Sequence, residues 1–151
     1  MVIIPILFWL LLLICCGYAV AYGGRDGRWA AAMLVAATML TVPATLLGRS
    51  FGRTEVALFL VDFGLLCGLY TLMLKSKAYW PIWMTGFHLV AVVTHLSTMI
   101  VPEFGWKIYR ALETVWALPV LVSMLVGIAR DRTAEIRATI DAGRSRASTS
   151  R

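Results

Sequence analysis

Apolar residues occur along this chain in five long runs separated by short polar stretches. The runs cover residues 2–22, 29–47, 55–74, 79–101 and 109–129. Each is close to the roughly 20 residues that an α-helix needs to cross a hydrocarbon core of about 30 Å. The pattern predicts an all-α integral membrane protein, with a bundle of five transmembrane helices in one domain over residues 1–130.

Short segments rich in glycine and charge separate the runs and predict loops. They are GGRDGR at 23–28, GRSFGR at 48–53, Lys75-Ser76-Lys77, and PEFGWK at 102–107. After residue 130 the chain keeps helical spacing to about Ala142 and then becomes rich in serine and arginine. Residues 131–151 are therefore predicted to be a basic tail that passes from helical to disordered.

The composition agrees with a membrane protein. Hydrophobic residues make up 60% of the chain and charged residues 15%, whereas soluble domains have about 45–50% and about 25%. The formal charge of +6 lies in the tail and the short loops, where it favours orientation and headgroup contact. We expect the lipid bilayer as the partner, and no nucleic acid.

The distribution of basic residues predicts the topology. Five spans place the two termini on opposite sides. With the C-terminus cytoplasmic, four basic residues in loops and six tail arginines, ten in all, lie inside, and four lie outside, as the positive-inside rule requires. A cleaved signal peptide at 2–22 would reverse this count, so we interpret that run as a membrane helix, with the N-terminus outside.

Five Asp, Glu and His residues lie within the apolar runs. They are Asp62, His88, His95, Glu113 and Glu55. His88 and His95 are seven residues apart, so they share one helix face. Counting about 1.5 Å per residue from the cytoplasmic ends predicts two polar layers. Asp62 and His88 form the layer near mid-membrane, and His95 lies with Glu113 and Glu55 toward the outside.

These layers allow two interpretations. A charged residue at the bilayer centre costs about 2.5–3.5 kcal/mol and should face the bundle. Asp62, His88 and Thr85 could form a satisfied hydrogen-bond network that holds the helices together, which we favour. Alternatively, a carboxylate beside a histidine can carry a proton.

The candidate residues do not predict a cofactor, a metal site or an enzyme. His95, Glu113 and Glu55 offer the ligand types that zinc uses, but their spacing matches no metal motif. Haem with two histidine ligands needs opposed helices, and both histidines share one face of one helix. Motifs of nucleophilic, nucleotide-binding or metalloprotease sites do not occur.

Two further patterns concern the packing of helices and the position of a helix end at the membrane interface. Gly64 and Gly68 form a GxxxG pattern that favours close helix packing. Tyr79, Trp80 and Trp83 form an aromatic cluster typical of residues that anchor a helix at the membrane interface.

The segment from Val61 to Arg130 combines an acid in VDFGLL, a short basic turn, the stretch YWPIWMTGFHLVAVVTHL, and a closing kinked helix after W-K-x-Y. It resembles small uncharacterised polytopic inner-membrane proteins of bacteria. The resemblance implies a compact inner-membrane helix bundle and no particular activity.

We therefore expect a structural or accessory protein of the bacterial inner membrane that packs with itself or with a partner. One alternative is a proton- or cation-linked transporter or channel subunit that uses the intramembrane Asp, His and Glu residues. The other is a cofactor-binding redox subunit.

Overall fold

The computed structural model describes residues 3–51, 54–100 and 106–149, which form five α-helices and no strand. The helices are α1 (Ile3–Tyr22), α2 (Gly24–Phe51), α3 (Thr54–Lys75), α4 (Trp80–Ile100) and α5 (Trp106–Thr149). Side chains are not described for residues 3–5, 42, 44–51, 54–55, 98–100, 106–115 and 147–149. The prediction of an all-helical chain is confirmed for the described part.

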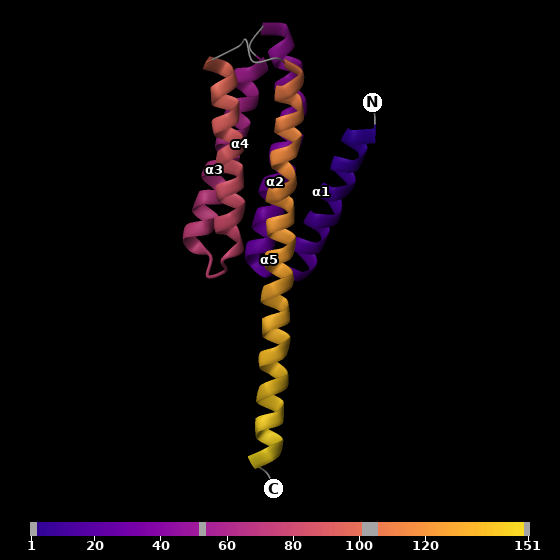
Figure 1. Ribbon diagram of the computed structural model, residues 1–151, viewed down its shortest axis with the longest axis vertical. Helices are drawn as coiled ribbons and strands as arrows, with labels where there is room; N and C mark the ends of the chain where they lie inside the picture. The colour runs from indigo at the N-terminus through magenta and orange to yellow at the C-terminus, as the bar shows by residue number, and fades with distance from the viewer. Residues whose placement is uncertain (1–2, 52–53, 101–105, 150–151) are drawn as a thin grey trace.

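The helices pack in chain order. Each contacts the next one along the chain, and α5 also contacts α1, so the series closes on itself. Figure 1 shows α1 leaning away from the other helices toward the N-terminus, and α5 continuing far beyond the bundle. Among the α1 side chains that the structure describes, from residue 6 onward, the buried ones accordingly begin at Leu12 and include Cys15 and Ala19, whereas Ile6 and Leu7 are exposed.

The connection between α1 and α2 is shorter than the predicted loop at 23–28. Helix α1 ends at Tyr22 and α2 begins at Gly24, so only Gly23 separates them. Gly24 has a φ of +58°, a left-handed conformation that glycine adopts without steric cost. A Cβ at Gly23 would lie 2.6 Å from the carbonyl oxygen of Ala19. These glycines let the chain reverse within one residue and leave the following charged residues inside α2.

Two other helices extend beyond their predicted ends. Helix α2 continues to Phe51, through most of the loop predicted at 48–53, and α5 continues to Thr149. The described part of the tail after Ala142, which ends at Thr149, is therefore helical, where we expected disorder. No proline follows Pro119 in this helix, and Gly143 alone weakens a helix by only about 1 kcal/mol.

The core contains side chains from all five helices. Its largest fully buried side chains include Leu69 on α3, Met84 on α4, and Leu121 and Met124 on α5. On α5 the last buried side chain is Ile128, and every side chain from residue 130 to residue 146 is exposed. The bundle therefore ends near residue 129, and the remaining part of α5 projects from it.

Apolar character is strongest in α3. Within the part of the chain whose side chains are described, Val56–Lys75 is the one helix long and apolar enough to cross a membrane, and α1 offers a shorter apolar stretch, Ile6–Tyr22. Only 11% of the apolar window in α3 is buried by the rest of the protein. The core helix of a soluble domain would be mostly covered, so this exposure is a weak indication of membrane association.

Candidate functional site

Three ionisable side chains from α3 and α4 meet inside the bundle. His95 Nδ1 lies 2.7 Å from Asp62 Oδ2, and His88 Nε2 lies 3.0 Å from the backbone oxygen of Asp62. We call Asp62, His88 and His95 the α3–α4 polar cluster. Both histidines are buried, whereas the Asp62 side chain is 27% exposed. One residue of α3 thus receives contacts from two residues of α4.

The directions of helix groups explain this double contact. Side chains on a helix tilt toward its N-terminus, and carbonyl oxygens point toward its C-terminus. Helices α3 and α4 are joined by a short turn at 76–79 and run antiparallel (Figure 1). The Asp62 carboxylate therefore reaches away from the turn toward His95, while its carbonyl points back toward His88. The seven-residue spacing of the histidines, about 10 Å along α4, spans both groups.

The acceptors determine which nitrogen carries a proton. A carbonyl oxygen only accepts, so His88 donates from Nε2–H to Asp62. His95 Nδ1–H donates to the Asp62 carboxylate, and a separation of 2.7 Å is typical of a charge-assisted hydrogen bond. The Asp62 carbonyl has a second lone pair for its own helix bond. The cluster therefore gives Asp62 Oδ2 a hydrogen-bond partner and links α3 to α4 at two points.

The pairing corrects the two predicted layers. We expected Asp62 to lie with His88, and His95 to lie with Glu113 and Glu55. The Asp62 carboxylate instead pairs with His95, and His88 contacts the backbone of the same residue. The side chains of Glu113 and Glu55 lie outside the described residues. A depth count from helix ends misses this pairing because it ignores the direction in which side chains tilt.

Thr85, predicted to join the network, bonds within its own helix. Its hydroxyl donates to the Pro81 carbonyl at 2.7 Å, and the side chain is buried one turn before His88. Among the side chains that the structure describes, no three His, Cys, Asp or Glu residues are grouped to hold a metal ion. The arrangement of the cluster suits helix packing and proton exchange between a carboxylate and an imidazole.

The two glycines of the GxxxG pattern differ in their surroundings. A Cβ at Gly68 would lie 2.6 Å from the Met33 sulfur of α2, whereas a Cβ at Gly64 would meet nothing within 4 Å. Close packing of α3 on α2 therefore uses Gly68, and Gly64 is exposed. A closer approach occurs at Gly127 on α5, where a Cβ would overlap the Trp80 side chain. Gly127 lacks a GxxxG partner, so the sequence pattern did not single it out.

The aromatic cluster divides between surface and core. Tyr79 is 80% exposed and Trp83 is 65% exposed, as a role at a membrane interface requires. Trp80, which we expected to be a third anchor, is only 5% exposed and packs against Gly127. Through this contact Trp80 joins α4 to α5.

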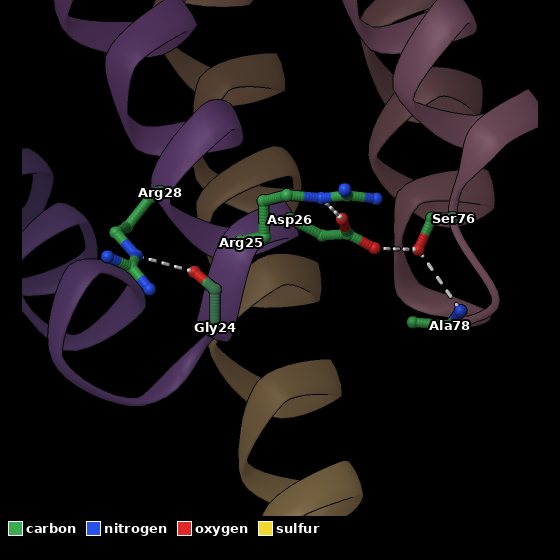
Figure 2. A network of polar contacts seen from close by, with 6 residues as sticks. All are labelled: Gly24, Arg25, Asp26, Arg28, Ser76 and Ala78. Carbon is green, nitrogen blue, oxygen red and sulfur yellow. Dashed lines mark hydrogen bonds and ion pairs between the residues drawn. The ribbon is translucent and has the colours of Figure 1, made fainter.

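A second polar network lies at the end of the bundle that carries the short turns (Figure 2). Ser76 Oγ donates to Asp26 Oδ2 at 2.6 Å and accepts from the Ala78 amide at 3.1 Å. Arg25 Nε lies 3.9 Å from the other Asp26 oxygen. This network joins the start of α2 to the turn between α3 and α4. The sequence contained one signal for this network, because Asp26 and Ser76 each lie in a short segment rich in basic residues.

The sequence and fold of this chain were also compared with those of known proteins. No protein-family model matches the chain, and no similar protein was found among curated proteins or solved structures.

Proposed function

We propose that the protein is an integral membrane protein whose five helices cross the bilayer, and that its role is structural or accessory. One observation carries this proposal: the two histidines are buried inside the bundle, whereas large apolar side chains cover its outer surface. His88 and His95 are buried, while large apolar side chains of every helix are exposed. Examples are Leu13, Met39, Leu60, Val93 and Val122. Water would disfavour such a surface, and lipid favours it.

Helix length supports the same proposal. The shortest helix, α1, has 20 residues, and α4 has 21. At 1.5 Å per residue, each is about 30 Å long, the thickness of a hydrocarbon core. Helix α3 satisfies both length and apolarity by itself. In α4 the two histidines lower the hydropathy, and their contacts with Asp62 are those that a polar residue needs in a membrane.

The structural role rests on the α3–α4 polar cluster. Apolar contact drives helix association weakly in lipid, because lipid tails are as apolar as leucine side chains. Hydrogen bonds and close approach at small residues then determine which helices pair. Asp62 supplies a carboxylate and a carbonyl to two histidines, and Gly127 admits Trp80. We propose that this rigid bundle packs in the bacterial inner membrane with itself or with a partner.

Fractionation and reporter fusions test the membrane assignment. We expect the full chain to remain in the membrane pellet after alkaline carbonate and to require detergent for extraction. A fluorescent protein fused after residue 151 should fluoresce, and alkaline phosphatase fused there should be inactive, because the C-terminus is proposed to be cytoplasmic. Release by carbonate would refute the membrane proposal, and an active phosphatase fusion would refute the orientation.

A second function, proton transfer, is favoured by the contact between the Asp62 carboxylate and the His95 imidazole. The Asp62 side chain is 27% exposed, and its partner His95 is 3% exposed. A carboxylate that contacts a buried imidazole can exchange a proton with it. Proton flux into liposomes that contain the protein, compared with Asp62→Asn, tests this role. Flux lost in the variant would support it, and equal flux in both would reject it.

A further inference from the structure

The fold gathers basic residues from three separate segments at one end of the bundle. The Ser76–Asp26 hydrogen bond places the turn between α3 and α4 beside the start of α2. The Arg132 guanidinium lies 3.8 Å from the centroid of the Tyr22 ring, so the start of the projecting part of α5 lies beside the end of α1. We call residues 22–28, 75–80 and 128–132 the basic end.

The basic end has a net positive charge. Six basic residues and two acidic residues give a formal charge of +4 (6 − 2), and the six basic side chains are all exposed. They are Arg25, Arg28, Lys75, Lys77, Arg130 and Arg132. The Asp26 carboxylate is already engaged by Ser76 and Arg25. Within the described part of the chain, Lys75, Lys77 and Arg130 form no salt bridge, so no acidic side chain compensates their charges.

Exposed aromatic residues lie close to these basic residues along the chain. Trp29 is 61% exposed, Tyr79 is 80% exposed and Trp83 is 65% exposed. Tryptophan and tyrosine favour the headgroup level of a bilayer. Trp29 directly follows Arg28, and Tyr79 lies two residues after Lys77. In the proposed membrane location, the basic side chains would therefore be at the height of lipid headgroups, beside apolar helix surfaces suited to acyl chains.

We propose that the basic end binds the headgroups of anionic phospholipids, an inference that rests on the proposed membrane location. Several lysines and arginines directly beside a membrane helix attract anionic headgroups. Lysine offers a mobile point charge to a phosphate, and arginine offers a planar fork of donors. Because the charge is distributed over α2, the turn between α3 and α4, and α5, a bound headgroup contacts several helices of the folded bundle.

Native mass spectrometry of the full chain in detergent tests this proposal. Phosphatidylglycerol and phosphatidylcholine with the same acyl chains would be titrated separately. We expect preferential binding of phosphatidylglycerol, and a loss of about fivefold in affinity for each charge removed at the basic end. The test variant is Lys75→Gln/Lys77→Gln, and Arg130→Gln is a second, single change on another helix. Equal binding of the two lipids overturns the proposal.

The projecting part of α5 provides a matched control. Arg144→Gln/Arg146→Gln removes the same charge from exposed positions far from the basic end (Figure 1). Phosphatidylglycerol binding should be unchanged in this control, and an equal loss would overturn the proposal. Displacement by inorganic phosphate at the same concentration would indicate a free-phosphate site instead of a lipid site, and would also overturn it. Carbonate extraction tests the membrane location separately, so the two failures are distinguishable.

Discussion

His95 Nδ1 on α4 lies 2.7 Å from Asp62 Oδ2 on α3, and the imidazole is buried whereas the carboxylate is partly exposed. His88, two turns away on the same helix, donates to the backbone of the same aspartate. The two histidines thus depend differently on Asp62. The contact of His95 requires the side chain of Asp62, whereas the contact of His88 requires only the backbone of Asp62.

This difference predicts unequal coupling energies. A double-mutant cycle of Asp62→Ala with His95→Ala should give a coupling of about 0.5–2 kcal/mol in the free energy of unfolding, because each single variant leaves a buried polar partner behind. The cycle of Asp62→Ala with His88→Ala should be close to additive. Reversible unfolding in mixed detergent micelles measures both. A larger coupling for His88 than for His95 would contradict the geometry.

Glycine substitutions should distinguish close helix contacts from open positions. Gly127→Ala places a Cβ against Trp80, and overpacking of this kind costs about 1–3 kcal/mol. Gly64→Ala meets nothing within 4 Å and should stabilise α3 slightly, because alanine favours a helix by up to about 1 kcal/mol. The melting temperatures of the two variants in detergent should therefore shift in opposite directions. A melting temperature for Gly127→Ala at or above that of the wild type would refute the contact.

The hydrogen bond between Ser76 and Asp26 should contribute to stability at the turns. Ser76→Ala removes a bond of 2.6 Å to a carboxylate, and we expect a loss of about 1 kcal/mol because the site is only partly buried. Thr71→Ala is the matched control, since the Thr71 hydroxyl bonds only to its own helix and is exposed. Unfolding free energies that are equal for the two variants would show that the network adds nothing.

Removal of the projecting helix should leave the bundle intact. A chain that ends at Thr133 keeps every buried residue of α5 and the stacking of Arg132 on Tyr22, so its melting temperature should match that of the full chain. A chain that ends at Ala129 also loses Arg132, and should be less stable by about 0.5–1 kcal/mol. A large loss already at Thr133 would mean that the projecting helix contributes to the bundle.

The pattern of the sequence predicted the helices better than their ends. Apolar runs near 20 residues indicated five helices, and the described residues form five. Whether all five cross a membrane stays a prediction. The connection at 23–28 was predicted as a loop because glycine and charge usually mark one, yet Gly24 adopts a left-handed conformation that allows a one-residue turn. Local composition signals a break without giving its length.

The sequence predicted which residues form the candidate site but not which of them contact one another. The spacing of His88 and His95 places them on one helix face, and both are buried against α3. The groups that they contact depend on how the two antiparallel helices are aligned along their axes. A shift of one helix by a single turn moves each side chain by about 5 Å and would change its partner. Trp80 and Trp83 show the same limit, because equal residue types three positions apart differ in burial when a neighbour such as Gly127 leaves space for one of them.

By itself, the sequence determined the helical class, the apolar runs, the basic turns and the shared face of the two histidines, because periodicity and composition act within one segment. Only the tertiary structure decided that His95 pairs with the Asp62 carboxylate, that His88 takes its carbonyl, and that basic residues from three segments meet at one end. Contacts between helices depend on their register and tilt, which arise from packing of the whole bundle.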